Sequence, residues 1–487
     1  MERVMNDFDV LVRGGLVATM DASRRVLAAD VLVRDGRIVE IVAREAGASK
    51  GRRAPTGPSH AERGQRSAEG QRGAEGDAGP RRRVRILDAA GAIVVPGFVQ
   101  THVHLCQALF RGMADELPLL DWLRERIWPL EAAHDEASLA ASAALGVAEM
   151  MRAGTTTILD MGTVHHHDAV FETLAASRIR AVSGKAMMDR GLGVPKGLRE
   201  STKDSLRETE RLIARWHGAE GGRLRYALAP RFILSCSERL LRASGEISLG
   251  TGTLVHSHAA EHPGEKTEVR EQLGMDDVDA LASYGLAGPH VVLAHGVQLT
   301  RAQMRRCGKN GTRFVHCPSA NLKLASGIAD VVAMREAGMT VGLGADGAPC
   351  NNRMDPFTEL RQAALLAKVV RKDAAALSPM DALAMLTIEG ARVLGLEAEV
   401  GSIEVGKRAD LTVVRLEGLH AEPHEETRWG DPVARLVYSA TASDVSDVII
   451  DGVPVVVRGE LLAMDERTVR EDARRHAVLV HHRARLS

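Results

Sequence analysis

The chain between residues 93 and 346 alternates short apolar segments with longer amphipathic ones, and this alternation constrains the fold more than any other feature. Segments such as EASLAASAALGVAEMMRAG and ADVVAMREAGM have the apolar spacing of amphipathic helices. The predicted strands between such segments are IVVPGFVQTHVH, TTTILDM, RAVSGKAMMD, LRYALAP, GTLVHSH, VVLAHG, TRFVHCP and TVGLGAD. Eight units of strand followed by helix predict an α/β protein built on a (β/α)8 barrel of the TIM type.

Both ends of the chain show the period-two alternation of strands. The first 43 residues contain FDVLVRGGLVAT and ADVLVRDGRIVEIVA, and the chain after residue 400 contains GSIEVGKRADLTVV and DVIIDGVPVVVRGE. Because the late strands can pair with the early ones, we expect both ends to form one small β-sandwich domain. The predicted domains are 1–92 and 399–487 for this small domain, the latter with a tail helix, and 93–398 for the barrel.

Residues 45–84 interrupt the N-terminal alternation with a stretch rich in Gly, Ala, Arg and Glu that has almost no large apolar residue. Such a stretch buries too little surface to offset the entropy of ordering it, so we predict a disordered insertion. A basic nucleic-acid-binding tail is the alternative. The interleaved glutamates dilute its positive charge and disfavour that interpretation.

The overall composition gives no sign of a nucleic-acid or membrane partner. The net charge is −1, and no run of 18 apolar residues or apolar leader segment occurs. Five scattered cysteines without CxxC spacing argue against a disulfide framework and favour a reducing compartment. We therefore expect a soluble, cytoplasmic homo-oligomer that acts on a small molecule.

Imidazole and carboxylate groups occur at the ends of several predicted strands. His102 and His104 are two residues apart on the first strand, so their side chains share a face. His258 ends the fifth strand, His295 the sixth and Asp346 the eighth. Barrel active sites lie at these carboxyl ends, and such a ligand set suits Zn²⁺. A single strand-end histidine is more often structural, but the joint pattern predicts a metal site.

Glu261 follows His258 by three residues, just beyond the fifth strand. A carboxyl group there would reach a substrate held over the metal and move protons. The alternative is a glutamate favoured by the dipole of a helix N-terminus. The proximity of His258 favours the catalytic interpretation.

These motifs together resemble the amidohydrolase superfamily, in the branch of the cyclic-amidine aminohydrolases. The resemblance rests on PGFVQTHVH, on H-x-x-E at 258–261, on AHG at the sixth strand, on GADG at the eighth and on VGSIEVGKRADLTVV, and it covers nearly the whole chain. The segments QALFRGMADELPLLDWLRERIWPLE and GADGAPCNNRMDPFTELRQAALLAK resemble those of adenosine-type deaminases. Such deaminases act on 5'-deoxyadenosine, 5'-methylthioadenosine, S-adenosylhomocysteine or adenosine.

The resemblance implies an enzyme with one divalent metal ion, Zn²⁺ or alternatively Fe²⁺, that lowers the pKa of a bound water. Glu261 would protonate the ring nitrogen beside carbon 6, and His295 would stabilise the developing tetrahedral centre. Asp346 would accept the water proton, and Asp346 or Glu261 would protonate the leaving ammonia. The implied metal ligands are His102, His104, His258 and Asp346.

Two-metal members of the superfamily carry a modified lysine at the end of the fourth strand. The segment LRYALAPRF has no lysine, and Lys185 lies in the middle of the third strand. We therefore expect a single metal, with Lys185 in a structural role.

The resemblance also suggests substrate contacts. Trp122 and Asp121 match the residues that cover the ligand and bind the ribose hydroxyls, a role that suits a carboxylate; a capping Asp beside a packed Trp is the alternative. Arg190 and Arg231 would meet the 5' substituent or be structural. Glu261 and His295 complete the predicted substrate contacts.

Several further polar residues stay open at this point. The triplet His165, His166 and His167 offers a second metal site, or one residue facing the pocket with the others in solvent or beginning a helix. Cys317 and Cys350 are expected to pack as small apolar residues. Ser319 and Asn321 are expected to shape the floor of the pocket.

Two other functions remain as alternatives. An aminohydrolase or chlorohydrolase of another heterocycle, such as guanine, an oxopurine or a triazine, would use the same metal and Glu261. Asp121 and Trp122 discriminate here, because a free base has no ribose to hold. A catalytically inactive scaffold is disfavoured because every expected ligand is present.

Overall fold

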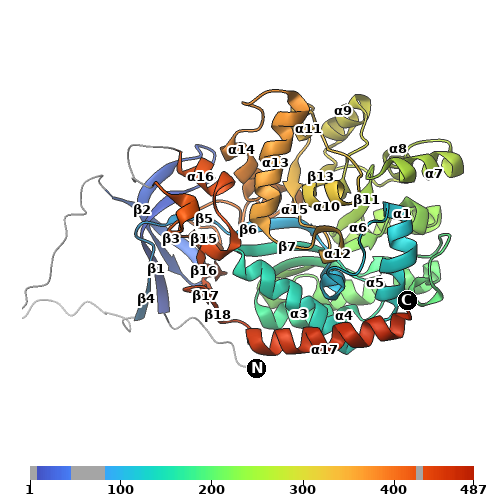
Figure 1. The fold of residues 1–487 in the computed structure, drawn as a ribbon, viewed down its shortest axis with the longest axis horizontal. Helices are drawn as coiled ribbons and strands as arrows, with labels where there is room; N and C mark the ends of the chain where they lie inside the picture. Colours follow the sequence, from blue (N-terminus) through green and yellow to red (C-terminus); the bar gives the residue numbers. More distant parts are fainter. Residues whose placement is uncertain (1–7, 45–82, 424–430, 487) are drawn as a thin grey trace, which may run out of the picture.

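The computed structural model describes residues 8–44, 83–423 and 431–486, and it contains two sheets (Figure 1). One sheet is a closed ring of parallel strands, because β11 pairs with both β12 and β10. The ring strands are β6 (Phe98–Val103), β7 (Thr155–Met161), β8 (Arg180–Gly184) with β9 (Ala186–Met187), β10 (Leu224–Pro230), β11 (Leu254–Ala259), β12 (Val291–His295), β13 (Arg313–His316) and β14 (Val341–Leu343). The predicted (β/α)8 barrel is confirmed.

Helices surround this ring (Figure 1). Their starts follow capping signals in the sequence: Asp135 and Thr300 form capping boxes, and Ser201 and Ser237 accept N-terminal backbone N–H groups. The larger helices are α3 (Glu136–Arg152), α4 (His167–Ser177), α5 (Thr202–Trp216), α6 (Glu238–Thr251), α7 (Pro263–Leu273), α8 (Asp277–Ser283), α9 (Arg301–Asn310), α13 (Pro356–Arg371), α14 (Pro379–Met385) and α15 (Ile388–Leu394).

Short helical turns follow several strands at the carboxyl end of the ring. The longest such segment follows β6 and covers one side of the pocket described below. It runs through a 3₁₀ turn (Leu105–Phe110), α1 (Leu119–Trp122), a π-helical turn (Leu123–Ile127) and α2 (Trp128–Ala132). The others include α10 (Pro318–Lys323), α11 (Val331–Glu336) and α12 (Ala348–Asn351).

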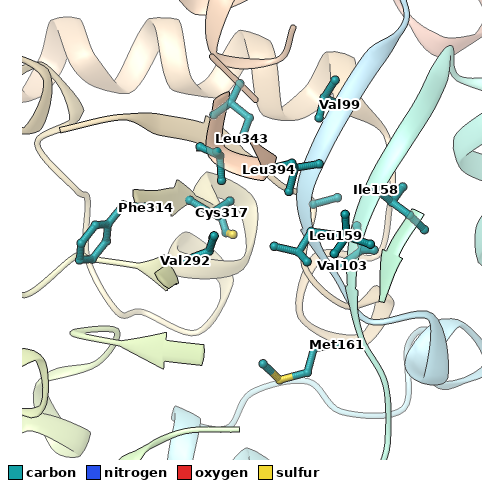
Figure 2. Close-up of a cluster of buried hydrophobic side chains, with 14 of the residues drawn as sticks. Val99, Val103, Ile158, Leu159, Met161, Val292, Phe314, Cys317, Leu343 and Leu394 are labelled. Carbon is teal, nitrogen blue, oxygen red and sulfur yellow. The ribbon is translucent and has the colours of Figure 1, made fainter. Parts of the chain in front are cut away.

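The barrel is held together by a continuous buried apolar core. Figure 2 shows part of it, with side chains from β6, β7, β12, β13 and β14. Val99, Ile158, Phe314 and Leu343 are all completely buried. Burial of such side chains contributes roughly 1.5–3 kcal/mol each, which fixes the strands and hence the positions of the residues at their ends.

The second sheet is formed by both chain ends, as predicted. Its strand order is β18–β17–β16–β15–β5–β1–β2–β3, with β4 paired to β1. One apolar cluster lies within this small domain alone, while other side chains of the sheet, such as Val448 and Val456, belong to the core that it shares with the barrel. Its strands are β1 (Phe8–Ala18), β2 (Val26–Arg34), β3 (Arg37–Ala43), β4 (Arg83–Asp88), β5 (Ile93–Pro96), β15 (Leu411–Val414), β16 (Val445–Ile450), β17 (Val453–Val457) and β18 (Glu460–Leu461).

The segment IVVPGFVQTHVH, predicted as one barrel strand, is two strands. Residues 93–96 pair with β1 and β15 in the small sheet, and the barrel strand begins only at Phe98. Gly97 separates them where a Cβ atom would lie 2.2 Å from the side chain of Thr156. The exact domain boundaries at 92/93 and 398/399 stay a prediction.

The C-terminal helix α17 (Glu466–Ala484) packs on the barrel, against α3 and α2 (Figure 1). A shared apolar cluster includes Phe110, Leu130 and Val480. The α16 helix (Pro432–Tyr438) packs against α14 and α13.

The predicted disordered insertion lies outside the described residues for 45–82, while Arg83 and Val84 belong to β4, so its predicted end is two residues too late. No helix within the described ranges is long and apolar enough to cross a bilayer. All five cysteines lie in the described part of the chain, and each is buried and free.

Candidate metal centre and active site

His102 and His104 lie at the carboxyl end of β6 and point to the same side, as their spacing predicts. Their ring centroids are 4.8 Å apart. His258, on β11, brings its Nε2 atom to 3.2 Å from Nε2 of His104. One ring nitrogen from each of the three histidines lies within 4.8 Å of the corresponding nitrogens of the other two. The barrel therefore gathers ligands that are 154 residues apart in the chain.

Asp346 approaches the same point from the loop after β14. Its backbone has a positive φ of 63°, and its N–H donates to the carbonyl of His102 at 3.0 Å. Its Oδ1 atom lies 3.4 Å from Nε2 of both His102 and His104. A Cβ atom at Gly344 would lie 2.6 Å from the His102 carbonyl, so glycine is needed for this close approach.

The hydrogen bonds of His104 and His258 fix their tautomers. Nδ1 of His104 lies 2.8 Å from the Met161 carbonyl, and Nδ1 of His258 lies 2.6 Å from the Arg231 carbonyl. A carbonyl only accepts, so both Nδ1 atoms carry hydrogen and the neutral rings present bare Nε2 lone pairs to each other. A cation between these lone pairs relieves their repulsion, and the carbonyl partners are those typical of metal-binding histidines.

His102 fits the same scheme through His256. Nδ1 of His102 lies 2.9 Å from Nε2 of His256, and Nε2 of His102 is buried with no hydrogen-bond partner in the described structure. Burial lowers the pKa of His102 and His104 well below the usual range, so both are neutral. Neutral imidazoles with free Nε2 atoms and one carboxylate are the donor set that Zn²⁺ accepts.

Glu261 and His295 lie together beside these ligands. Oε2 of Glu261 is 3.3 Å from Nε2 of His295, which is in turn 4.0 Å from Oδ2 of Asp346. The Asn321 amide donates to Nδ1 of His295 at 3.0 Å, which leaves the hydrogen of the neutral ring on Nε2, facing Glu261.

The electrostatic environment shifts the pKa values of the two carboxyl groups of the site, Glu261 and Asp346, in opposite directions. Burial, followed by the charges of Asp346 and Glu265, raises the pKa of Glu261 well above its usual range. Burial acts in the same direction on Asp346, but His295, His104 and His258 outweigh it and lower the pKa of Asp346. Glu261 therefore keeps its proton to a higher pH than Asp346, an order that suits a proton donor beside a proton acceptor.

These groups open into a narrow cleft at the carboxyl end of the barrel. One wall carries the polar groups already described, and the other is apolar. The lining residues are His104, Gln107, Leu119, Trp122, Leu123, Arg231, Phe232, His258, Glu261, Glu265, His295, Leu324 and Asp346. Gln107, Glu265, Phe232 and Leu324 had no functional signal in the sequence, because nothing in the local pattern brings them to the metal ligands.

A buried ion pair behind the cleft was also missed. Arg231 donates to both carboxylate oxygens of Glu131, at 2.5 and 3.0 Å, and Gln107 donates to the same carboxylate at 2.8 Å. Arg231 is 3% exposed and Glu131 is 2% exposed. Arg231 thus lines the cleft as the fixed partner of a second residue, and its carbonyl orients His258.

The predicted substrate-binding residues are only partly brought together. Trp122 is buried and lines the cleft, and its indole N–H donates to the Ala114 carbonyl at 3.1 Å. Asp121 is exposed on α1 and is not part of the cleft lining. Arg190 lines a neighbouring cavity, where it donates to Gln272 at 2.8 Å.

The histidine triplet lies away from the cleft. His165 and His166 are exposed, and His167 is buried at the start of α4 with Nε2 at 2.9 Å from Ser183 Oγ. The expectation that one of them faces the pocket is therefore wrong. Lys185 is fully buried and donates to Glu200 at 2.6 Å, as expected for a structural residue.

The remaining rim residues are buried. Cys317 has its sulfur within 4.8 Å of ligand atoms of His102 and Asp346, closer to the metal position than expected. Cys350 Sγ contacts the Gly347 carbonyl at 3.1 Å. Ser319 bonds to Glu359 through its backbone N–H, at 3.1 Å.

With this geometry in place, comparisons with known proteins identify the family. The model of the amidohydrolase family matches residues 93–455. The chain belongs to the amidohydrolase family. Members of this family depend on metal, in accord with the ligand cluster.

Two relatives in this family are deaminases. The 5'-deoxyadenosine deaminase of Methanothermobacter thermautotrophicus is 38% identical over 386 residues, 79% of this chain and 87% of the relative. The 5-methylthioadenosine/S-adenosylhomocysteine deaminase of Moorella thermoacetica is 36% identical over 384 residues, 79% of this chain and 86% of the relative.

A solved amidohydrolase structure superposes along almost the whole chain. It is an adenosine deaminase from Xanthomonas campestris with bound zinc, with a TM-score of 0.84 and 30% identity, covering 98% of this chain and 99% of that protein. The similarity thus includes the small sheet as well as the barrel.

Proposed function

We propose that this protein hydrolytically deaminates an adenine nucleoside, 5'-deoxyadenosine or a related 5'-modified adenosine. Water replaces the 6-amino group, so the products are the corresponding inosine-type nucleoside and ammonia. The named activities of the similar proteins support the nucleoside as substrate.

One observation carries the proposal. A buried carboxyl group with a raised pKa, Glu261, lies beside histidine and aspartate groups that are arranged to hold one cation. Hydrolysis at an amidine carbon needs a proton donor for the ring nitrogen and a general base for water. The raised pKa of Glu261 suits the donor, and the lowered pKa of Asp346 suits the base. This complete set also disfavours an inactive scaffold.

We propose Zn²⁺ as the metal, with Fe²⁺ as the alternative, held by His102, His104, His258 and Asp346. When bound, such a cation lowers the pKa of a water molecule and so supplies a nucleophile near neutral pH. The zinc in the similar adenosine deaminase supports this choice.

The side chains of this protein then perform the proton transfers. Asp346 accepts a proton from the attacking water, and Glu261 gives its proton to the ring nitrogen next to carbon 6, which makes that carbon more electrophilic. His295 donates from Nε2 to the oxygen that adds to carbon 6. As ammonia leaves, Asp346 returns its proton to the amino group, and the proton of the added hydroxyl passes to Glu261, so both carboxyl groups regain their starting state.

Ammonia release from a panel of compounds tests the substrate class. The panel contains 5'-deoxyadenosine, 5'-methylthioadenosine, S-adenosylhomocysteine, adenosine, guanine and cytosine, with a triazine to cover chlorohydrolase activity. We expect turnover of one or more adenine nucleosides. Because Asp121 lies outside the cleft lining, the nucleoside assignment rests on the relatives, and turnover confined to the free bases or the triazine would overturn it.

Glu261→Gln tests the proton donor. The substitution keeps the size of the side chain but removes the acidic proton, so we expect kcat to fall by about 10²–10⁴-fold. Metal content, measured by elemental analysis, should stay that of the wild type. An active Glu261→Gln protein would remove Glu261 from the mechanism.

A further inference from the structure

The turn that carries Glu261 is held by carboxyl groups instead of backbone acceptors. The Ala260 N–H donates to Asp277 Oδ2 at 2.5 Å, and the Glu261 N–H donates to Glu265 Oε2 at 3.2 Å. Two consecutive backbone donors beyond β11 are thus satisfied by two side chains.

This turn needs support because its backbone is strained. Ala260 has a φ of 53°, in the left-handed region that residues with a Cβ atom rarely adopt. Such a conformation is unfavourable for a residue with a Cβ atom and persists only where surrounding contacts impose it. Here Asp277 additionally accepts the N–H of Val278 at 2.7 Å, which ties the turn to the start of α8.

The same turn is joined to the loop that carries His295. Gly296 donates to the Ala259 carbonyl at 3.1 Å, and Gln298 donates to the Ala260 carbonyl at 2.8 Å. Both sides of the Glu261–His295 pair are therefore set by one hydrogen-bonded unit. A change in the turn would move Glu261 relative to His295.

Both supporting carboxyl groups are buried, and burial of an acidic group costs folding free energy. Glu265 is 1% exposed and lines the cleft, and Asp277 is 3% exposed. Burial and the proximity of Asp277 raise the pKa of Glu265, and burial raises that of Asp277. Two buried acids in one place are expensive, which indicates a functional reason for keeping them.

We propose that Glu265 and Asp277 are positioning residues that hold the Ala260–His262 turn so that the Glu261 carboxyl group is fixed against His295 before substrate binds. They act through backbone hydrogen bonds and do not contact the reacting atoms. The consequence for turnover rests on the proposed function, since it assumes that Glu261 is the proton donor. The role of the two residues in fixing the geometry of the turn does not depend on that assumption.

Two substitutions at Glu265 distinguish the effect of its hydrogen bond to the turn from the effect of its ionisable proton. Glu265→Ala removes the acceptor, and Glu265→Gln keeps one acceptor oxygen without the ionisable proton. We expect kcat of Glu265→Ala to fall at least tenfold, with KM changed less than threefold and metal content unchanged. Glu265→Gln should have a kcat at least fivefold above that of Glu265→Ala. Glu271→Gln, an exposed carboxylate on the same helix, is the matched control.

Asp277→Asn provides a second variant that changes little in volume. It retains one acceptor oxygen where two N–H groups need one each, so the turn should loosen without loss of the fold. Amide hydrogen exchange of a peptide covering residues 254–265 measures this directly. We expect faster exchange there in Asp277→Asn and Glu265→Ala than in the wild type and Glu271→Gln.

The two readouts distinguish the inference from the proposed function. If no adenine nucleoside is turned over, the proposed function fails while hydrogen exchange still decides the role of the two carboxyl groups. Unchanged exchange in both variants would overturn the positioning role. Equal loss of kcat in Glu265→Ala and Glu265→Gln would also overturn it, because the proton of Glu265 would then matter more than its hydrogen bonds.

Discussion

The two walls of the cleft differ in how the chain builds them. The metal wall consists of side chains at or just beyond the ends of β6, β11, β12 and β14, and its ligand atoms converge within a few ångströms. The opposite wall consists of side chains on the segment after β6 and the loop after β10, such as Leu119, Trp122 and Phe232. The first wall is fixed by the barrel core, and the second by local helix packing.

This difference shows for which residues a sequence motif predicts the position in the fold. Strand-end residues inherit their positions from a closed hydrogen-bonded ring, so His102, His258 and Asp346 meet as predicted. Asp121 and Trp122 are neighbours in the chain, but on α1 they point to different sides, one to solvent and one to the cleft. Substitutions on the metal wall should therefore reduce activity strongly, and substitutions on the outer face of α1 should change activity little.

The largest effect is expected from His258→Ala on the metal wall. Loss of one ligand leaves an incomplete coordination shell, so we expect metal content and ammonia release both to fall to the level of a metal-depleted preparation. Elemental analysis and steady-state kinetics measure the two quantities. A His258→Ala protein that retains its metal and its activity would break the assignment of this wall.

A large loss of stability is expected from Glu131→Ala behind the cleft. The substitution leaves the buried Arg231 guanidinium without its carboxylate, and breaking such a pair costs about 3–5 kcal/mol. Chemical denaturation measures the free energy of unfolding. A change below 1 kcal/mol would mean that Arg231 is not held by Glu131 in solution.

The pH dependence of turnover should report the protonation of Glu261. Burial and the charges of Asp346 and Glu265 raise its pKa, so the carboxyl group keeps its proton to a higher pH than a free glutamate does. We expect kcat/KM to decrease as the pH rises through this raised value. A pH profile of the wild type measures this decrease, and the residual activity of Glu261→Gln should lack it.

The smallest effect is expected from Asp121→Asn on the outer face of α1. The side chain is exposed and outside the cleft lining, so KM and kcat should change less than twofold and stability by less than about 0.5 kcal/mol. Steady-state kinetics with the best nucleoside substrate measures it. A tenfold rise in KM would show that α1 turns its outer face toward the ligand when substrate binds.

Much of the fold and the inner site was predictable because it depends on periodic patterns. Short apolar segments that alternate with amphipathic helical ones predicted the barrel strands, and the spacing of His102 and His104 predicted their common face. The division at Gly97 was not predictable, because apolar residues continue across it and only pairing with β1 and β15 assigns 93–96 to the small sheet. The packing of α17 on the barrel likewise depends on a partner surface distant in the sequence.

By itself, the sequence determined the residue types and their order: four metal-ligand groups, a glutamate three residues after His258, and the strands that carry them. Only the tertiary structure decided the tautomers, through the Met161 and Arg231 carbonyls, and the difference in proton affinity between Glu261 and Asp346. Tautomer and pKa depend on burial and on neighbours from other strands. Those neighbours are set by the closing of the barrel and not by local sequence.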